Sequence, residues 1–135
     1  MSLLASPRFL RQVLWADAAS GAATGLLHLS AGATLAALLG LPATLITGSG
    51  LLLLAYVALA GWLATQDPLP RTAAWVLVAG NWAWVAACLV LLFGGSLAPT
   101  LAGQVYLAVQ AFAVAVLAEL QMTGLRRQAR PPGWA

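Results

Sequence analysis

Four long stretches that are almost free of charge constrain the fold of this chain most strongly. They cover about residues 9–39, 43–64, 72–93 and 100–122 of the 135-residue sequence. A helix of about 20 apolar residues crosses the roughly 30 Å hydrocarbon core of a bilayer, so each stretch is long enough to span a membrane. Only 7% of the residues are charged and 62% are hydrophobic, whereas about 25% are charged in an average soluble domain. The sequence therefore predicts an all-α membrane protein with four transmembrane helices, and it excludes a soluble fold and a nucleic-acid-binding protein.

Prolines separate the four predicted helices. Pro42 follows the first stretch, Pro68 lies between the second and third, and Pro99 lies between the third and fourth. Proline disrupts a helix interior because it lacks the backbone N–H and its ring clashes with the preceding turn. Connections this short join antiparallel neighbours. We therefore expect a four-helix up-down bundle in one membrane domain, residues 1–135, with a short tail at 124–135.

All the basic residues fall on one side of the predicted membrane. They precede the first helix, lie between the second and third, or follow the fourth: Arg8, Arg11, Arg71, Arg126, Arg127 and Arg130. Because arginine and lysine concentrate in cytoplasmic loops, this pattern predicts that both termini are cytoplasmic. The first helix is expected to be retained rather than cleaved as a signal peptide, since Asp17 and His28 interrupt its apolar stretch. The predicted location is a bacterial inner membrane, crossed several times.

Small and polar residues form a stripe on the first and on the fourth predicted helix. The first stripe contains Asp17, Ser20, Gly21, Thr24, Gly25 and His28, and the second contains Gln104, Ala108, Ala111, Ala115 and Glu119. Small residues let helix backbones approach closely in lipid, so Ser20, Gly21, Thr24 and Gly25 are predicted helix-packing residues. If the two stripes face each other, Asp17 meets Glu119 near the cytoplasmic end. His28 then lies toward Gln104 at the opposite end.

Two interpretations of Asp17 and Glu119 are open. Two carboxyl groups close together in a low dielectric would share a proton, and with His28 they would form a proton or cation site. Alternatively, each acid is an ion-paired group near the interface, with Arg11 or Arg126 reaching inward.

The other polar residues in the predicted spans indicate neither an enzyme nor a cofactor. Asn81 and Gln110 are expected to form hydrogen bonds between helices, and His28 is expected to be a hydrogen-bonded core residue. One histidine and one cysteine, Cys88, cannot build a zinc site within one chain. The sequence has no GxxxxGK phosphate-binding loop. No metal or cofactor is therefore predicted.

Two classes of function fit these features. The first is a non-enzymatic accessory or interaction subunit, whose partners are the lipid bilayer and either a second copy or a larger membrane complex. The second is a small proton-coupled transporter or channel that uses Asp17 and Glu119.

Short motifs extend over almost the whole chain. They are Asp17-Ala18, Ser20-Gly21, Gly40-Leu41-Pro42, Asn81-x-x-Trp84-Val85, Pro99-Thr100 and Gly124-Leu125-Arg126-Arg127. With these motifs the chain resembles an uncharacterised family of small four-span bacterial integral membrane proteins, a resemblance that implies no activity. It is also loosely similar to small multidrug-resistance transporters, which have four short helices and a carboxylate in the first. Asp17 is the counterpart of that carboxylate, but the aromatic and glycine pattern of their later helices is not evident.

Overall fold

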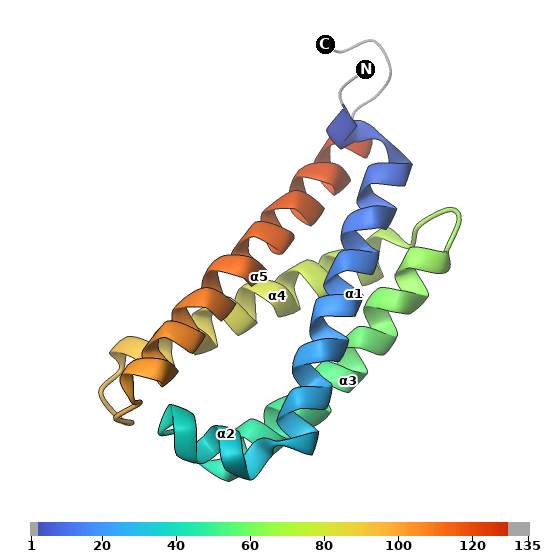
Figure 1. The fold of residues 1–135 in the computed structure, drawn as a ribbon. Helices are drawn as coiled ribbons and strands as arrows, with labels where there is room; N and C mark the ends of the chain where they lie inside the picture. The colour runs from blue at the N-terminus through green and yellow to red at the C-terminus, as the bar shows by residue number, and fades with distance from the viewer. Residues whose placement is uncertain (1–2, 130–135) are drawn as a thin grey trace.

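The computed structural model describes residues 3–129, which form helices joined by short connections (Figure 1). In chain order these are η1 (Leu3–Ala5), α1 (Pro7–Ser30), α2 (Gly32–Leu39), α3 (Ala43–Thr65), α4 (Arg71–Phe93) and α5 (Leu101–Gln128). The all-helical prediction is confirmed. Helices α3, α4 and α5 are long and apolar enough to cross a membrane, and α1 with α2 adds a fourth span if the bent pair counts as one. Several apolar helices of this length indicate a multi-pass membrane protein.

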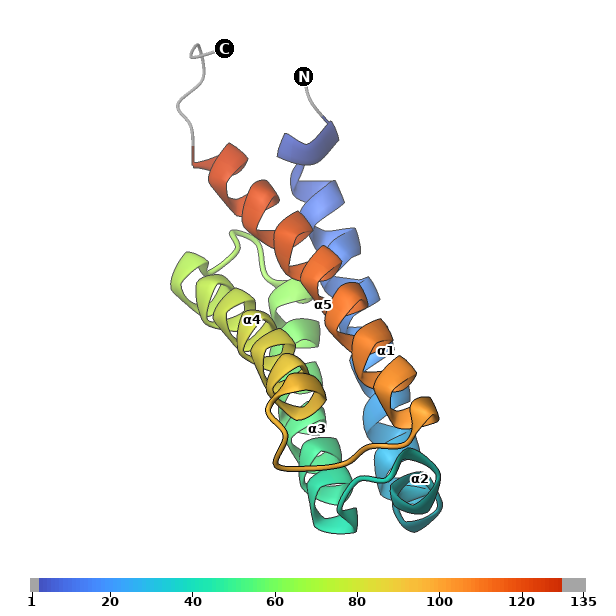
Figure 2. The same cartoon turned by 90° about the vertical axis from the view of Figure 1, so that its left-hand side faces the viewer.

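The first predicted helix, residues 9–39, is wrong as a single helix, because α1 and α2 meet at an angle of 92°. A straight helix of that length would extend about 46 Å, far more than the hydrocarbon core requires. Instead α2 lies across the end of the bundle, beside the start of α5 (Figure 2). Thr100, the N-cap residue of α5, holds it there: its amide donates to the Leu39 carbonyl at 3.1 Å, and its hydroxyl donates to the Leu38 carbonyl at 2.7 Å.

Helix α5 continues to Gln128, six residues beyond the predicted end at 122. The predicted tail, 124–135, therefore begins inside a helix, and Arg130 lies outside the described residues. Gly124, where the predicted tail begins, lies within α5 and forms a packing contact: a Cβ there would lie 3.2 Å from Leu10 Cδ1. The last turn of α5 is thus held against the first turns of α1.

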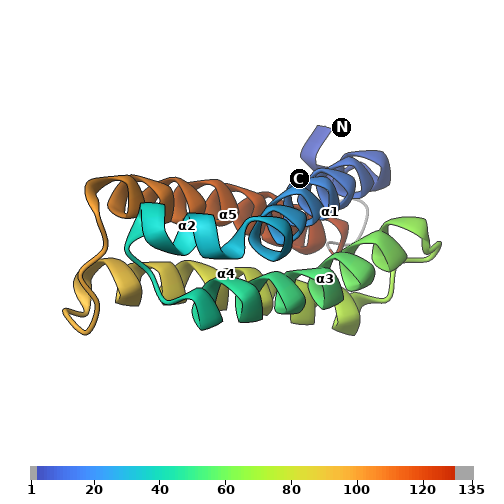
Figure 3. The same ribbon diagram turned by 60° about the horizontal axis from the view of Figure 1, so that its bottom comes forward.

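The four long helices form two layers, α1 with α5 and α3 with α4 (Figure 3). Each helix packs mainly on one in the other layer, α1 along α3 and α4 along α5. Helices α1 and α3 run antiparallel, because Gly21 faces Val57 and Gly25 faces Leu53. Helices α4 and α5 also run antiparallel, as shown by the hydrogen bonds of Asn81 to Gln121 and of Trp84 to Gln110. Helices α3 and α4 touch over a short length and then diverge (Figure 1). This divergence opens the space in which the candidate site lies.

Two apolar clusters close the ends of the bundle. Leu10, Leu63, Leu77 and Leu125 belong to one, and Leu39, Ile46, Val85 and Leu107 to the other. Between the clusters the interior contains buried polar side chains. The outer surface carries many exposed apolar residues, including Leu51, Val76, Val90, Val105, Val109 and Phe112. Apolar surface of this extent is expected where lipid covers the helices, since soluble monomers rarely expose large apolar patches.

Candidate functional site

The Asp17 carboxylate lies where all four long helices meet, and each helix contributes one side chain to it. Its Oδ2 atom accepts hydrogen bonds from the Tyr56 hydroxyl (2.9 Å), Asn81 Nδ2 (2.9 Å) and Gln121 Nε2 (2.5 Å). Asp17 is 3% exposed, Asn81 4% and Gln121 1%. We call these four residues the Asp17 cluster.

Within this cluster the donors also bond to one another and to the backbone. Asn81 uses its second amide hydrogen on Gln121 Oε1, at 2.9 Å. The Tyr56 hydroxyl also approaches the Leu77 carbonyl, at 3.3 Å. The three donors replace the water that the carboxylate lost on burial. Because they are neutral, they bring no positive charge to balance Asp17.

A groove of about 870 Å³ lies beside the Asp17 cluster, and α1, α3, α4 and α5 all line it. Its volume is in the range of ligand pockets in proteins. Asp17, Tyr56 and Asn81 contribute to the groove, whereas most of its other lining residues are apolar. Trp84 also lines it and donates from Nε1 to Gln110 Oε1 at 3.3 Å, which links α4 to α5. The groove is therefore apolar, with one carboxylate in its wall.

Ser20 and Thr24 extend the polar side of this groove along α1. The Ser20 hydroxyl donates to the Asp17 carbonyl at 3.0 Å, and the Thr24 hydroxyl donates to the Ser20 carbonyl at 2.9 Å. Since each hydroxyl hydrogen bonds within the helix, the oxygen lone pairs are the groups left for a ligand. A row of oxygen acceptors thus leads from Asp17 along the groove.

A second polar group surrounds His28, which is 3% exposed. Its Nδ1 lies 2.8 Å from Ser49 Oγ, and its Nε2 lies 2.5 Å from the Tyr106 hydroxyl. Ser49 donates its hydroxyl hydrogen to the Ile46 carbonyl at 2.7 Å. Nδ1 of His28 must therefore donate to Ser49, and Nε2 accepts from Tyr106. We call His28, Ser49 and Tyr106 the His28 cluster; it is satisfied by a neutral imidazole.

The structure does not bring Glu119 to Asp17, nor Gln104 to His28. Glu119 is exposed and accepts a hydrogen bond from Thr123 at 3.4 Å, while Gln104, also exposed, donates to the Pro99 carbonyl at 3.3 Å. Their expected places are taken by Gln121 and Tyr106, two positions further along α5. Two residues correspond to about 200° around a helix, so Glu119 and Gln104 face nearly the opposite way. Ala111, in the same predicted stripe, is buried.

The predicted helix-packing residues divide between two roles. Gly21 and Gly25 lie against α3 rather than α5: a Cβ on Gly21 would lie 2.9 Å from Val57 Cγ2. Ser20 and Thr24 line the groove. Arg11, the expected partner of Asp17, donates to the Gln66 carbonyl at 3.3 Å.

The sequence analysis missed four residues of the two clusters: Tyr56, Gln121, Ser49 and Tyr106. The one sequence signal for Gln121 is that it is a polar residue inside the predicted span 100–122, and polar residues in a span usually face the protein interior. Tyr56 could also have been found, since a buried tyrosine hydroxyl usually has a hydrogen-bond partner.

Comparison of the chain with protein-family models, with curated proteins and with solved structures gave no significant match. Function is therefore argued from the geometry. Among residues 3–129, no three side chains of metal-ligating type lie together. A carboxylate in an apolar groove can bind either a proton or a cation that carries apolar groups, and such intramembrane acids often serve ion or proton pathways.

Proposed function

We propose that this chain is a four-span, up-down protein of a bacterial inner membrane that binds a lipophilic cation in its groove in exchange for a proton on Asp17. Both termini lie in the cytoplasm in this proposal. The arginine pattern supports that orientation. Arg71 at the start of α4 donates to the Leu125 carbonyl near the end of α5, at 2.9 Å, so it lies at the same end of the bundle as the end of α5.

The observation that carries the proposal is the Asp17 carboxylate, buried beside the groove and held by neutral donors from three other helices. A buried charge without a counter-charge is costly. Two occupants of the carboxylate relieve that cost, a proton or a cation. Because both need the same group, binding of one releases the other, and this competition couples them.

The apolar lining determines the kind of cation. Trp84, Leu52 and Phe112 all line the groove, and an aromatic face attracts a cation that has lost its water. A small hydrated ion would leave this apolar surface unused. A cation with apolar substituents fills the groove and still neutralises Asp17.

This proposal retains the transporter hypothesis but removes Glu119 from it, since that side chain faces away from the groove. The accessory-subunit hypothesis has no comparable feature in its favour, because any lipid-facing helix presents exposed apolar residues. It stays a prediction, which co-purification of a stoichiometric partner in mild detergent would support. The proposed exchange makes and breaks no covalent bond in a ligand, so the chain remains non-enzymatic.

Equilibrium binding of tetraphenylphosphonium to the purified chain tests the proposal. We expect binding that weakens as the pH falls, since protons compete for Asp17. Asp17→Asn should abolish it while keeping the shape of the side chain, and Glu119→Gln is the matched control, with wild-type affinity. Equal affinity of Asp17→Asn and the wild type would refute the proposal.

A further inference from the structure

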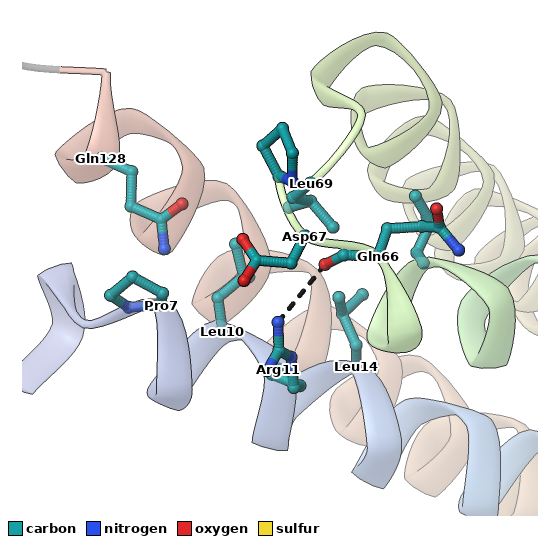
Figure 4. Close-up of a pocket in the computed structure, with 10 residues that line it drawn as sticks. Pro7, Leu10, Arg11, Leu14, Gln66, Asp67, Leu69 and Gln128 are labelled. Carbon is teal, nitrogen blue, oxygen red and sulfur yellow. Dashed lines mark hydrogen bonds between the residues drawn. The ribbon is translucent and has the colours of Figure 1, made fainter.

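A smaller pocket, of about 180 Å³, lies at the end of the bundle where α1 begins and α5 ends. Figure 4 shows Arg11 of α1, Asp67 of the α3–α4 connection and Gln128 of α5 converging on it. Among the described residues, none that lines this pocket also lines the groove beside Asp17. The pocket is therefore a separate site, and its role does not depend on the proposed cation exchange.

Two side chains with hydrogen-bond donors line this pocket, Arg11 from α1 and Gln128 from α5. The Arg11 guanidinium donates to the Gln66 carbonyl at 3.3 Å (Figure 4), and a guanidinium has five N–H donors in all. Gln128 Nε2 is buried and has no hydrogen-bond partner among the described residues. A buried amide without an acceptor costs free energy, so an acceptor taken up beside it is favoured. A charged donor and an amide donor together suit an anion with several oxygens, such as a phosphate.

A negatively charged side chain, Asp67, also lines this pocket. The Asp67 carboxylate points toward the pocket in Figure 4, close to Leu10 and Arg11. Carboxylate oxygens only accept hydrogen bonds, so this wall suits an ammonium group. Leu10, Leu14 and Leu63 form the inner wall, which is apolar. A ligand that fits all three walls carries a phosphate, a nearby primary amine and an apolar extension.

We propose that this pocket binds the headgroup of an aminophospholipid of the phosphatidylethanolamine type. The phosphate accepts hydrogen bonds from Arg11 and Gln128, the ammonium donates to Asp67, and the glycerol lies against the leucines. A pocket of about 180 Å³ is smaller than the roughly 300–1,000 Å³ of sites for drug-sized ligands, so it has room for a small polar group rather than for acyl chains. Its place at the ends of apolar helices is also where phospholipid headgroups lie in a membrane.

Native mass spectrometry of the delipidated full chain tests this site. We expect phosphatidylethanolamine to bind about tenfold more tightly than phosphatidylglycerol, which has the phosphate without the amine. Asp67→Asn should lower phosphatidylethanolamine binding to the phosphatidylglycerol level. Arg11→Gln should weaken both lipids. Arg8→Gln, at an exposed position on the same helix, is the matched control and should change neither.

Two further measurements separate a true site from its alternatives. Gln128→Leu should weaken phosphatidylethanolamine binding without lowering thermal stability in lipid-free detergent, because Nε2 has no hydrogen-bond partner among residues 3–129 to lose. Free phosphoethanolamine should not compete at concentrations equal to the lipid's; if it does, the ligand is a soluble phosphoamine and not a lipid. Equal binding of the two lipids by the wild type, or an unchanged preference in Asp67→Asn, would overturn the proposal. Asp17→Asn should keep the lipid preference, so the two proposals fail independently.

Discussion

Asp17 and His28 both lie on α1, about 16 Å apart along its axis, but the charge and the hydrogen bonds of their clusters differ. His28 bonds through both ring nitrogens to hydroxyl groups, and a neutral ring satisfies the whole cluster. Asp17 accepts from three neutral donors, which stabilise its charge but do not cancel it. Asp17 also lines the groove, whereas His28 does not. We infer that the His28 cluster joins helices and that the Asp17 cluster additionally binds ligands.

The largest effect is expected from Asp17→Leu. This change leaves Tyr56, Asn81 and Gln121 with buried donors that lack their shared acceptor. The free energy of unfolding should fall by about 3 kcal/mol, since each such group costs roughly 1–3 kcal/mol and the three partly rearrange. Reversible unfolding in mixed micelles measures this loss. If Asp17→Leu lowers the free energy of unfolding by less than His28→Leu does, the expected order of the two clusters is reversed.

A smaller loss of stability is expected from Gly50→Ala, at the contact of α3 with α1. A Cβ there would lie 3.0 Å from the Cβ of His28 and 3.0 Å from Leu29 Cγ, so the helices must separate. We expect a loss of about 2 kcal/mol, typical of overpacking. Gly48→Ala is the matched control, because nothing lies within 4 Å of a Cβ at that position. Equal losses for the two variants would show that close packing beside His28 is unimportant.

His28→Gln should lower stability by only about 1 kcal/mol, because it weakens two hydrogen bonds between neutral groups. Its affinity for tetraphenylphosphonium should equal that of the wild type, since the ring is not part of the groove. Thermal unfolding and equilibrium binding, measured on the same preparation, separate the two effects. Loss of cation binding with stability intact would give His28 the role assigned here to Asp17.

The smallest effect is expected from Glu119→Gln. The side chain is exposed and bonds to Thr123 within its own helix, so stability should change by less than about 0.5 kcal/mol. Cation binding and its pH dependence should not change. If this variant abolishes cation binding, Glu119 takes part in binding together with Asp17. The two carboxyl groups would then have to lie closer together than they do in this structure.

The helical architecture could be predicted from the sequence, together with two of the four residues of the Asp17 cluster and one of the three residues of the His28 cluster. Long apolar stretches predict helices of bilayer length, and the row that contains Asp17 and His28 lies on the buried side of α1. Polar residues in an apolar span are expected to face the protein interior. Asn81 is another such residue, and it bonds between helices as predicted.

The rotation of α5 could not be predicted, because alanine suits both lipid-facing and interior positions. From the sequence, a stripe through Gln104 and Glu119 is therefore as plausible as the buried face through Ala118 and Gln121. The bend between α1 and α2 has no proline to mark it. It is held by the hydrogen bonds from Thr100, which is 61 residues from Leu39 in the sequence. Contacts between residues so distant in the chain are not visible in local periodicity.

The exchange of a proton for a cation can be measured by counting the protons released when tetraphenylphosphonium binds, in a weakly buffered solution with a pH indicator. We expect the wild type to release up to one proton for each cation bound, with more release as the pH is lowered. His28→Gln and Glu119→Gln should release the same number, and Asp17→Asn should neither bind nor release. Binding without proton release by the wild type, or wild-type release by Asp17→Asn, would contradict the exchange of a proton for a cation at this carboxylate.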